Sequence, residues 1–375
     1  MAAGGIGTVR IVGTGLIGTS IGLALRGLGV RVLLSEPSAA ALALAVRVGA
    51  GQADAGGEPV ALVIVAGPPD ITAEVVATEL AAHPAATVTD VASVKSGIET
   101  ALRRAGADLT RYVGGHPMAG RERSGPVASR ADLFLGRPWV ICPGETGSAD
   151  PARVETVRRL ALALGATPVV MPAAEHDDAV ALISHVPQLA ASLVAARLVK
   201  AADPAVGLAG QGLRDVTRIA DSDPDLWAQI LAANAAPVGR VLREIRSDLD
   251  GLIEALTELE QPSPGPAAAG TAGAAGAKVA LARVVADGRA GRERIPGKHG
   301  EPVTRYATVT ALLPDRPGQL SRLFTDIGEA GINVEEFGLE HAAGQQVGLA
   351  AVSVLPAART ALEQALVGRG WHIVS

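Results

Sequence analysis

The chain has 375 residues, of which 48% are hydrophobic and 19% charged, and its formal net charge is -5 at pH 7. This length is too great for one small core and predicts two or three domains of a globular protein. The acidic balance argues against a nucleic-acid or anionic-membrane partner, because either would need a basic face. The single cysteine, Cys142, excludes an intrachain disulfide, and no uncharged apolar run approaches the roughly 18 residues of a membrane helix. We therefore expect a cytoplasmic protein with no membrane partner.

Residues 1–172 alternate short apolar runs with helical or loop segments. The runs have the length of strands and cover residues 9–12, 30–34, 61–65, 87–89, 112–114, 139–141 and 168–171. Continuous apolar strands suit a parallel sheet that is covered on both faces. The first domain is therefore predicted to be a doubly wound α/β Rossmann domain.

Residues 173–260 carry Ala/Leu-rich helical periodicity, strongest in 177–200 and 226–259. This pattern predicts an all-α second domain. Its apolar surface exceeds what one helical layer can bury against a sheet domain, so we expect a homodimer. A monomeric helical cap is the alternative.

The C-terminal part begins with residues 261–303, which we predict to be a flexible linker. Residues 261–277 are low in complexity and rich in Pro, Gly and Ala, and the basic run 289–298 is typical of a solvated linker. A compact pattern then resumes in residues 304–375, with strands expected at 306–313 and 347–354 and helices at 318–330 and 357–367. This pattern predicts a third, small α+β domain.

A glycine-rich turn, GTGLIG at residues 13–18, follows the first predicted strand and opens a helix. Gly13 permits a tight turn, Gly15 lets the backbone approach a pyrophosphate, and Gly18 lets the helix pack closely on the strand. Glu36 ends the second strand, where a carboxylate accepts hydrogen bonds from the ribose of NAD and repels the 2′-phosphate of NADP. A solvated turn residue is the alternative for Glu36. The candidate NAD-binding residues are Gly13, Gly15, Leu16, Ile17, Gly18 and Glu36.

Two further loops follow strands of the predicted sheet, at the edge where ligands bind in open α/β folds. They are DVASVK, residues 90–95, and GGHPMAG, residues 114–120. His116 in the second loop is either a histidine that hydrogen bonds a backbone carbonyl or a base near the cofactor, and its place on the cofactor face favours the base. Lys95 is interpreted as a solvated charge.

Several motifs, in this order behind the glycine-rich turn, resemble the prephenate dehydrogenase family of tyrosine biosynthesis. They are DVASVK, GGHPMAGRERSG, EHD (residues 175–177), ISHVPQ (183–188) and RDVTRIADSDPDLW (214–227). The segment LLPDRPGQLSRLFTDIGEAGINVEEF, residues 312–337, resembles an ACT domain, a small amino-acid-binding regulatory module, and this resemblance implies a ferredoxin-like α+β fold. The first resemblance implies an NAD-dependent oxidative decarboxylation of prephenate to 4-hydroxyphenylpyruvate, and the second implies feedback regulation by tyrosine. No metal is implied.

The resemblance also implies roles for individual residues. His116 becomes the base that hydrogen bonds the C4 hydroxyl of prephenate, and Ser93 orients the imidazole or shares that hydroxyl. An N-cap of the following helix is the alternative for Ser93. Arg218 matches the substrate-binding arginine, whose guanidinium can hold a carboxylate with two hydrogen bonds; an exposed helix stripe with Arg214 is its alternative. Ser184, His185 and Gln188 complete the candidate substrate-binding set, although His185 taken alone is more typical of a packing histidine.

One departure concerns substrate choice. Some family members carry a second histidine where this chain has Gln188. A neutral amide can hydrogen bond the pyruvyl group of prephenate, but it can also face the ammonium of arogenate. Prephenate is the preferred substrate, and arogenate is the alternative.

In the predicted ACT domain, two turns could hold the carboxylate and amine of a free amino acid. The candidate regulatory residues are Asp315, Pro317, Gly318 and Asn333. A domain that only dimerises is the alternative.

Two other functions compete with this hypothesis. A β-hydroxyacid dehydrogenase shares the layout of a Rossmann and a helical domain. It would need a catalytic lysine on the helix after the sheet, but no lysine occurs between Lys95 and Lys200. A catalytically silent amino-acid sensor would use the ACT domain alone, and the intact Gly13, Glu36, His116 and Arg218 argue against it.

Overall fold

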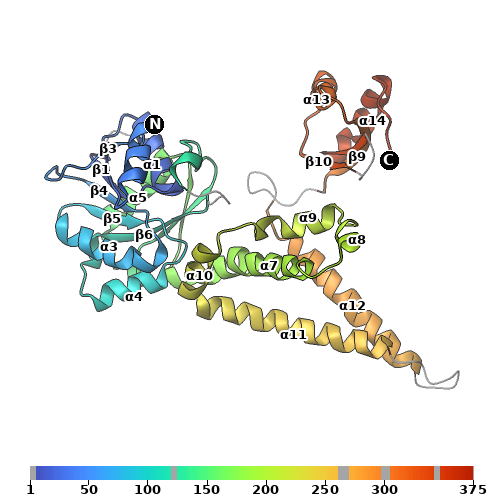
Figure 1. The fold of residues 1–375 in the computed structure, drawn as a ribbon, viewed down its shortest axis with the longest axis horizontal. Helices are drawn as coiled ribbons and strands as arrows, with labels where there is room; N and C mark the ends of the chain where they lie inside the picture. Colours follow the sequence, from blue (N-terminus) through green and yellow to red (C-terminus); the bar gives the residue numbers. More distant parts are fainter. Residues whose placement is uncertain (1–5, 120–124, 261–269, 297–304, 342–346, 375) are drawn as a thin grey trace. The chain divides into compact units, whose positions relative to one another are not determined.

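The computed structural model describes residues 6–119, 125–260, 270–296, 305–341 and 347–374. Contacts between residues divide the chain into two compact units, Met1–Arg246 and Ser247–Ser375 (Figure 1). The first unit holds the predicted Rossmann domain and most of the predicted helical domain. The predicted domain boundaries at 172 and 303 stay predictions.

An eight-stranded sheet forms the centre of the first unit, with the order β3-β2-β1-β4-β5-β6-β7-β8. Its strands are β1 Val9–Val12, β2 Val32–Ser35, β3 Gln52–Ala53, β4 Leu62–Val65, β5 Thr87–Asp90, β6 Tyr112–Pro117, β7 Pro138–Cys142 and β8 Thr167–Val170. All residues of β4 and β5 are buried, as expected of central strands covered on both faces.

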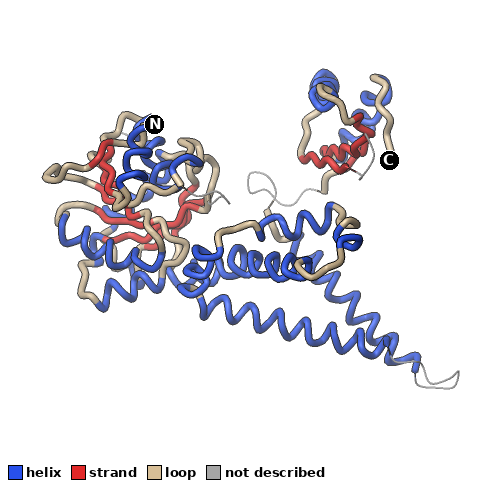
Figure 2. The backbone as a smooth tube through the Cα atoms, viewed as in Figure 1, coloured by secondary structure: helices blue, strands red, loops and turns tan. Residues whose placement is uncertain are grey.

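Helices cover both faces of this sheet, as Figure 2 shows by colour. They are α1 Leu16–Gly27, α2 Ala39–Arg47, α3 Pro69–Ala82, α4 Ser96–Arg104 and α5 Pro151–Ala163, with short 3-10 turns at Leu109–Arg111, Pro126–Ala128 and Glu145–Gly147. One apolar core joins the sheet to α1 and α5, and a second joins it to α3 and α4. The two cores confirm the predicted doubly wound Rossmann architecture.

The direction of the last strands differs from the prediction. β1 to β6 are parallel, but β7 runs antiparallel to β6 and parallel to β8. The apolar run 139–141 is the same whichever way the strand points, because burial on two faces decides its composition and not its direction. The sequence therefore predicted the strand but gave its direction wrongly, and it missed the short edge strand β3.

Helices continue the first unit after the sheet. They are α6 Ala173–Val180, a π-helical turn at Ala181–His185, α7 Val186–Leu198, α8 Asp203–Val206, α9 Gln211–Thr217, a 3-10 turn at Arg218–Ala220, α10 Pro224–Ala233 and the first part of α11 Ala235–Glu260, whose residues from Ser247 on belong to the second unit. The continuous helix Ala173–Leu198 is long and apolar enough to cross a membrane by length and composition alone. In this structure, however, its buried side chains of His176, Asp177 and His185 form hydrogen bonds with other groups of the first unit. A lipid environment would not supply such partners.

The second unit contains α12 Gly270–Arg292 and a small sheet. Helix α12 corrects the prediction of a flexible linker for these residues: alanine is the best helix former, and its frequency in this segment outweighs the glycines. Linker residues 261–269 and 297–303 lie outside the described residues. The described part of this segment is therefore helical as far as Arg292.

The small sheet is built from β9 Ala307–Pro314, α13 Gln319–Glu329, β10 Glu336–His341, β11 Val347–Val354, a 3-10 turn at Pro356–Ala358 and α14 Arg359–Gly368. The antiparallel strands have the order β10-β11-β9, and a bridge from Ala311 to Ile373 extends the sheet beyond β9. This βαββαβ order is the ferredoxin-like α+β arrangement that the sequence predicted.

Close approach between α1 and the sheet explains two of the glycines. Gly13 has a φ of +101°, and a Cβ there would lie 2.5 Å from the carbonyl oxygen of Ala66. A Cβ on Gly18 would lie 2.1 Å from the carbonyl oxygen of Gly13. Neither contact can be relieved by moving a side chain, because both obstacles are backbone.

Gly18→Ala is therefore expected to lower the free energy of unfolding by about 1 to 3 kcal/mol, the usual cost of overpacking. The matched control is Gly27→Ala in the same helix, where a Cβ meets nothing within 4 Å. That change should be neutral or stabilising by up to about 1 kcal/mol. Urea denaturation of both variants measures the difference, and equal midpoints would contradict the steric argument.

Candidate active site

The glycine-rich turn leaves the N-terminus of α1 open for an anion. Gly15 is the N-cap residue of α1, and no side chain caps the first amides. A Cβ on Gly15 would meet nothing within 4 Å, so the backbone is open on that side. Leu16 and Ile17 pack their side chains partly against the core and contribute amides to the first turn. Open amides at the positive end of a helix fit the pyrophosphate of a dinucleotide.

Glu36 lies beside this turn, after the end of β2. Its Oε2 accepts hydrogen bonds from the amide of Thr14 at 2.9 Å and from the Thr14 hydroxyl at 3.2 Å, while Oε1 accepts from the amide of Ser38 at 3.1 Å. Glu36 is therefore half-buried and held in place, which corrects the alternative of a solvated turn residue. A fixed carboxylate here suits the two ribose hydroxyls of NAD and disfavours a 2′-phosphate.

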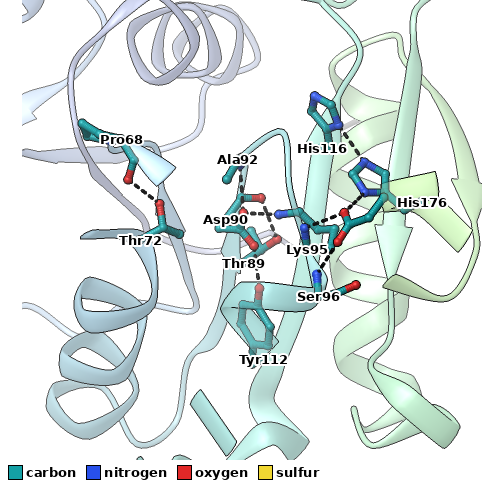
Figure 3. A network of polar contacts seen from close by, with 11 residues as sticks. Pro68, Thr72, Thr89, Asp90, Ala92, Lys95, Ser96, Tyr112, His116 and His176 are labelled. Carbon is teal, nitrogen blue, oxygen red and sulfur yellow. Dashed lines mark hydrogen bonds and ion pairs between the residues drawn. The ribbon is translucent and has the colours of Figure 1, made fainter. Parts of the chain in front are cut away.

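His116 lies on β6, with its Nδ1 2.8 Å from Nε2 of His176 (Figure 3). The two rings meet edge to face, with centroids 5.1 Å apart. Burial lowers the pKa of His116 well below its usual 6.5, and the nearby His176, Lys95 and His185 lower it further. The imidazole is therefore neutral at pH 7 and able to accept a proton, as a general base must.

Behind His116, Asp177 holds His176 in place. The Oδ1 atom of Asp177 is 2.8 Å from Nδ1 of His176, and both side chains are buried. The same carboxylate accepts hydrogen bonds from the amides of Lys95 at 2.9 Å and Ser96 at 2.8 Å, where α4 begins without a side-chain cap of its own. Burial acts to raise the pKa of Asp177, but the hydrogen bonds from His176, Ser96 and Lys95 outweigh it and lower the pKa. Asp177 is therefore ionised at neutral pH.

Lys95 is buried, so its interpretation as a solvated charge is wrong. Its side chain is 1% exposed and pairs with Asp90, whose other carboxylate oxygen accepts a hydrogen bond from the Tyr112 hydroxyl at 2.7 Å (Figure 3). Burial raises the pKa of Tyr112 well above 10, and Asp90 raises it further, so this hydroxyl remains a donor. The composition of DVASVK gave no sign that its lysine turns inward to the aspartate at the end of β5.

Ser93 lies in the loop between β5 and α4 and is half-buried. Because α4 begins at Ser96, the N-cap alternative for Ser93 is wrong. His176, and not Ser93, supplies the side chain that contacts His116 in the described part of the chain. The role of Ser93 in orienting the imidazole stays a prediction.

The π-helical turn presents the ISHVPQ motif. His185 is buried, its Nδ1 accepts a hydrogen bond from the Asn234 side-chain amide at 3.0 Å, and its ring meets Trp227 edge to face at 6.0 Å. Gln188 is buried, with its Nε2 3.5 Å from the Ser192 hydroxyl, and Ser184 is half-buried. The wide turn inserts an extra residue, so the simple i, i+4 spacing of Ser184 and Gln188 does not hold across it.

Arg218 begins the 3-10 turn after α9, and its side chain is exposed. That turn packs against α7, the helix that carries Gln188. Arg214 is also exposed, one turn earlier. The structure therefore places Arg218 on the segment that packs next to the ISHVPQ helix, and its substrate contact stays a prediction.

The candidate regulatory residues lie on two separate turns of the second unit. Gly318 adopts a left-handed conformation at the N-terminus of α13 and follows Asp315 and Pro317. Asn333 follows the other end of α13, where its Nδ2 donates a hydrogen bond to Glu335 at 2.7 Å. Eleven helical residues span about 16 Å, so one copy of this unit does not bring both turns around a single small ligand.

Sequence reasoning missed three residues of the site: His176, Asp177 and Asn234. His176 and Asp177 belong to the EHD motif, which supported the resemblance but received no role of its own. A histidine next to an aspartate in one predicted helix was the available signal. Asn234 lies between α10 and α11 and had no signal of its own. Within the described ranges, no group of three or more His, Cys, Asp or Glu could hold a metal ion.

Comparison with known proteins agrees with this geometry. The nucleotide-binding domain model of prephenate dehydrogenase matches residues 21–170, and its dimerization domain model matches residues 172–263. The protein named Probable prephenate dehydrogenase NovF, from Streptomyces niveus, is 39% identical over 327 residues, which cover 87% of this chain and 88% of that protein.

Two solved structures are also similar. Prephenate dehydrogenase from A. aeolicus, in complex with hydroxyphenyl propionate and NAD+, has a TM-score of 0.62 and 27% identity and covers 68% of this chain and 92% of its own. Arogenate dehydrogenase from Synechocystis has a TM-score of 0.57 and 27% identity and covers 68% of this chain and 94% of its own.

The open glycine-rich turn, the fixed Glu36 and the neutral His116 define an NAD-dependent oxidoreductase with a Rossmann domain. The chain belongs to the prephenate dehydrogenase family. This membership sets aside both the β-hydroxyacid dehydrogenase and the silent sensor. The family's activity is prephenate or arogenate dehydrogenation.

The burial of His185 predicts a pH dependence of stability. Burial lowers the pKa of His185 from 6.5 to about 4, with Asp177 opposing and His176 adding to the shift. Between these values the unfolded chain binds more protons than the folded one, so the free energy of unfolding falls as the pH drops from 6.5 towards 4.

The measurement is urea denaturation at several pH values in this window, compared with His185→Asn. The variant is less stable throughout, but its slope against pH should be smaller. His372→Gln, at an exposed histidine of the second unit, is the control and should keep the slope of the parent. Parallel curves for the parent and His185→Asn would show that His185 is not buried in its neutral form.

Proposed function

We propose that the enzyme oxidises prephenate to 4-hydroxyphenylpyruvate with NAD, in tyrosine biosynthesis. The observation that carries this proposal is the neutral His116 at the end of β6, on the same side of the sheet as the glycine-rich turn after β1. Support comes from the A. aeolicus relative, whose complex contains NAD+ and hydroxyphenyl propionate, a phenol with an acidic side chain like the proposed product.

In this reaction the chain has three tasks. His116 accepts the proton of the C4 hydroxyl as the ring loses carbon dioxide and becomes aromatic. NAD, when bound at the glycine-rich turn, would supply the acceptor for the hydride. Arg218 holds a carboxylate of the substrate, as a guanidinium can with two parallel hydrogen bonds. Ser184, Gln188 and Ser93 supply neutral hydrogen-bonding groups around the side chain and the hydroxyl.

Arogenate is the second candidate substrate. Gln188 is neutral, so it can accept a hydrogen bond from the arogenate ammonium as readily as it donates one to the prephenate side chain. The solved arogenate dehydrogenase from Synechocystis has the same identity to this chain as the A. aeolicus enzyme. Prephenate is preferred because the family models and the Streptomyces relative carry that name.

The test is the rate of NADH formation with each substrate. We expect kcat/KM to be higher with prephenate, and a higher value with arogenate would transfer the assignment to the alternative. His116→Asn should lower kcat by about 100- to 10,000-fold with either substrate, the usual loss for a general base. Arg218→Ala should act chiefly by raising KM, and an unchanged KM would remove Arg218 from the substrate site.

We also propose a cytoplasmic homodimer that forms through the helical segment. The matched dimerization domain supports this assembly, as do the exposed apolar side chains in that segment. They include Leu182, Ile183, Leu193, Val199 and Leu208. An apolar surface of this kind is typical of a face that a partner chain covers.

Residues 304–375 of the second unit are proposed to be an ACT domain that binds tyrosine as a feedback inhibitor. Their ferredoxin-like strand order and the glycine turn at the N-terminus of α13 support this assignment. The candidate residues are Asp315, Pro317, Gly318 and Asn333. Because the two turns lie at opposite ends of α13, a site that uses both needs two copies of the unit.

Tyrosine is expected to inhibit NADH formation, and Asn333→Ala should weaken that inhibition while leaving the uninhibited rate unchanged. Asn333 is exposed and donates its hydrogen bond to Glu335 in the same turn, so the substitution should not unfold the domain. The measurement is the tyrosine concentration for half-maximal inhibition. Inhibition that is competitive with substrate and unaffected by Asn333→Ala would place tyrosine in the active site instead.

A further inference from the structure

The contacts behind His116 determine which of its ring nitrogens can act as the base. A histidine that is neutral carries one proton, on either Nδ1 or Nε2, and only the bare nitrogen can accept another. The tautomer is fixed by the hydrogen bonds that the ring makes. In this chain those hydrogen bonds begin at a carboxylate.

Asp177 is the fixed end of this series of hydrogen bonds. A carboxylate only accepts hydrogen bonds, and Asp177 already accepts from the amides of Lys95 and Ser96. The 2.8 Å contact between Oδ1 of Asp177 and Nδ1 of His176 therefore requires a proton on that nitrogen. In neutral His176, Nε2 is then bare and acts as an acceptor.

The same rule of donors and acceptors applies to the ring of His116. Because Nε2 of His176 is an acceptor, Nδ1 of His116, 2.8 Å away, must carry the proton that joins them. Nε2 of His116 is left bare. Figure 3 shows this nitrogen on the side of the ring away from His176, and within the described ranges no side chain hydrogen bonds to it.

We propose that His176 and Asp177 are positioning residues that hold His116 in its Nδ1-protonated tautomer, so that Nε2 is the nitrogen that receives the substrate proton. This inference rests on the proposed function for the identity of the base. When Nε2 accepts the C4 hydroxyl proton, His116 becomes an imidazolium whose Nδ1–H still points at His176. The carboxylate of Asp177 lies behind it and offsets the new positive charge.

The other charged and titratable groups near His116 do not supply this function. Lys95 and His185 both disfavour a positive charge on His116. Lys95 is paired with Asp90, which also accepts from Tyr112, and His185 is held by Asn234. Among the described residues, the acceptor within hydrogen-bond distance of Nδ1 is therefore His176.

The first test reads the tautomer directly in the substrate-free protein. Two-bond 1H–15N correlation spectra of the ¹⁵N-histidine-labelled protein distinguish protonated from bare ring nitrogens, and His116→Asn assigns the signals. At pH 7 we expect His116 to carry its proton on Nδ1. A proton on Nε2 would overturn the proposal, whatever the substrate is.

The second test removes the acceptor. His176→Phe keeps a ring in place but has no nitrogen, so His116 should populate the Nε2-protonated form and kcat should fall by about 100-fold or more, with KM changed far less. His176→Gln offers an amide oxygen to His116 and an amide NH₂ to Asp177, and it should retain the Nδ1 tautomer and most of kcat. It also keeps the test decisive if the Phe variant does not fold.

The control is His372→Gln, which makes the same exchange at an exposed histidine of the second unit and should leave tautomer and kcat unchanged. An unchanged tautomer and kcat in His176→Phe, or equal losses in the Gln and Phe variants, would reduce His176 to a packing residue. If the tautomer is as expected but neither prephenate nor arogenate is turned over, the proposed function fails and the positioning role stands.

Discussion

The carboxylate of Asp177 is the point on which the geometry of the site depends. It joins the helical segment to the Rossmann domain, because it lies on α6 and accepts the amides of Lys95 and Ser96 at the start of α4. Helix amides left without an acceptor in a buried place would cost free energy, so this capping favours one fixed position for α6. The same carboxylate faces His176, so the position that caps α4 also positions the histidine pair. Structure and chemistry are therefore coupled through one side chain.

The site also separates its charges. Lys95 and Asp90 form one buried pair near His116, and Asp177 pairs instead with His176, the ring that contacts His116. A lysine this close, if it were unpaired, would oppose any positive charge on the imidazole still more strongly. Pairing with Asp90 reduces that opposition without removing it, which agrees with the lowered pKa of His116. A base that is fully neutral at pH 7 and can still be charged during turnover needs this balance.

Sequence patterns predicted the parts of this protein that follow from local physics. The turn at residues 13–18 needs glycine because backbone lies within 2.5 Å of where a Cβ would be at Gly13, and such a requirement leaves a trace in the sequence. Apolar runs located seven strands, most directly where burial on both faces demands them, as in β4 and β5, whereas β8 is only partly buried. Side-chain contacts that depend on the folded packing left no such trace. Lys95 reads as a surface charge although its partner Asp90 is only five positions away, and the contact between His116 and His176 joins residues 60 positions apart. Strand direction in β7 and the π-helical turn at 181–185 are likewise set by packing, which no local pattern encodes.

The π-helical turn has a physical reason that links it to the histidine pair. Residues before it, His176 and Asp177, must face the sheet edge and α4, whereas His185 at its end must reach Asn234. Nine residues of regular α-helix turn by about 900°, so His185 would lie on the side of the helix opposite to His176. A wider turn changes that phase, and His176 is then near enough to lower the pKa of His185. The Asn234 side-chain amide, which donates to both His185 and the backbone carbonyl of Asp177, then fixes the two turns of the helix at this spacing.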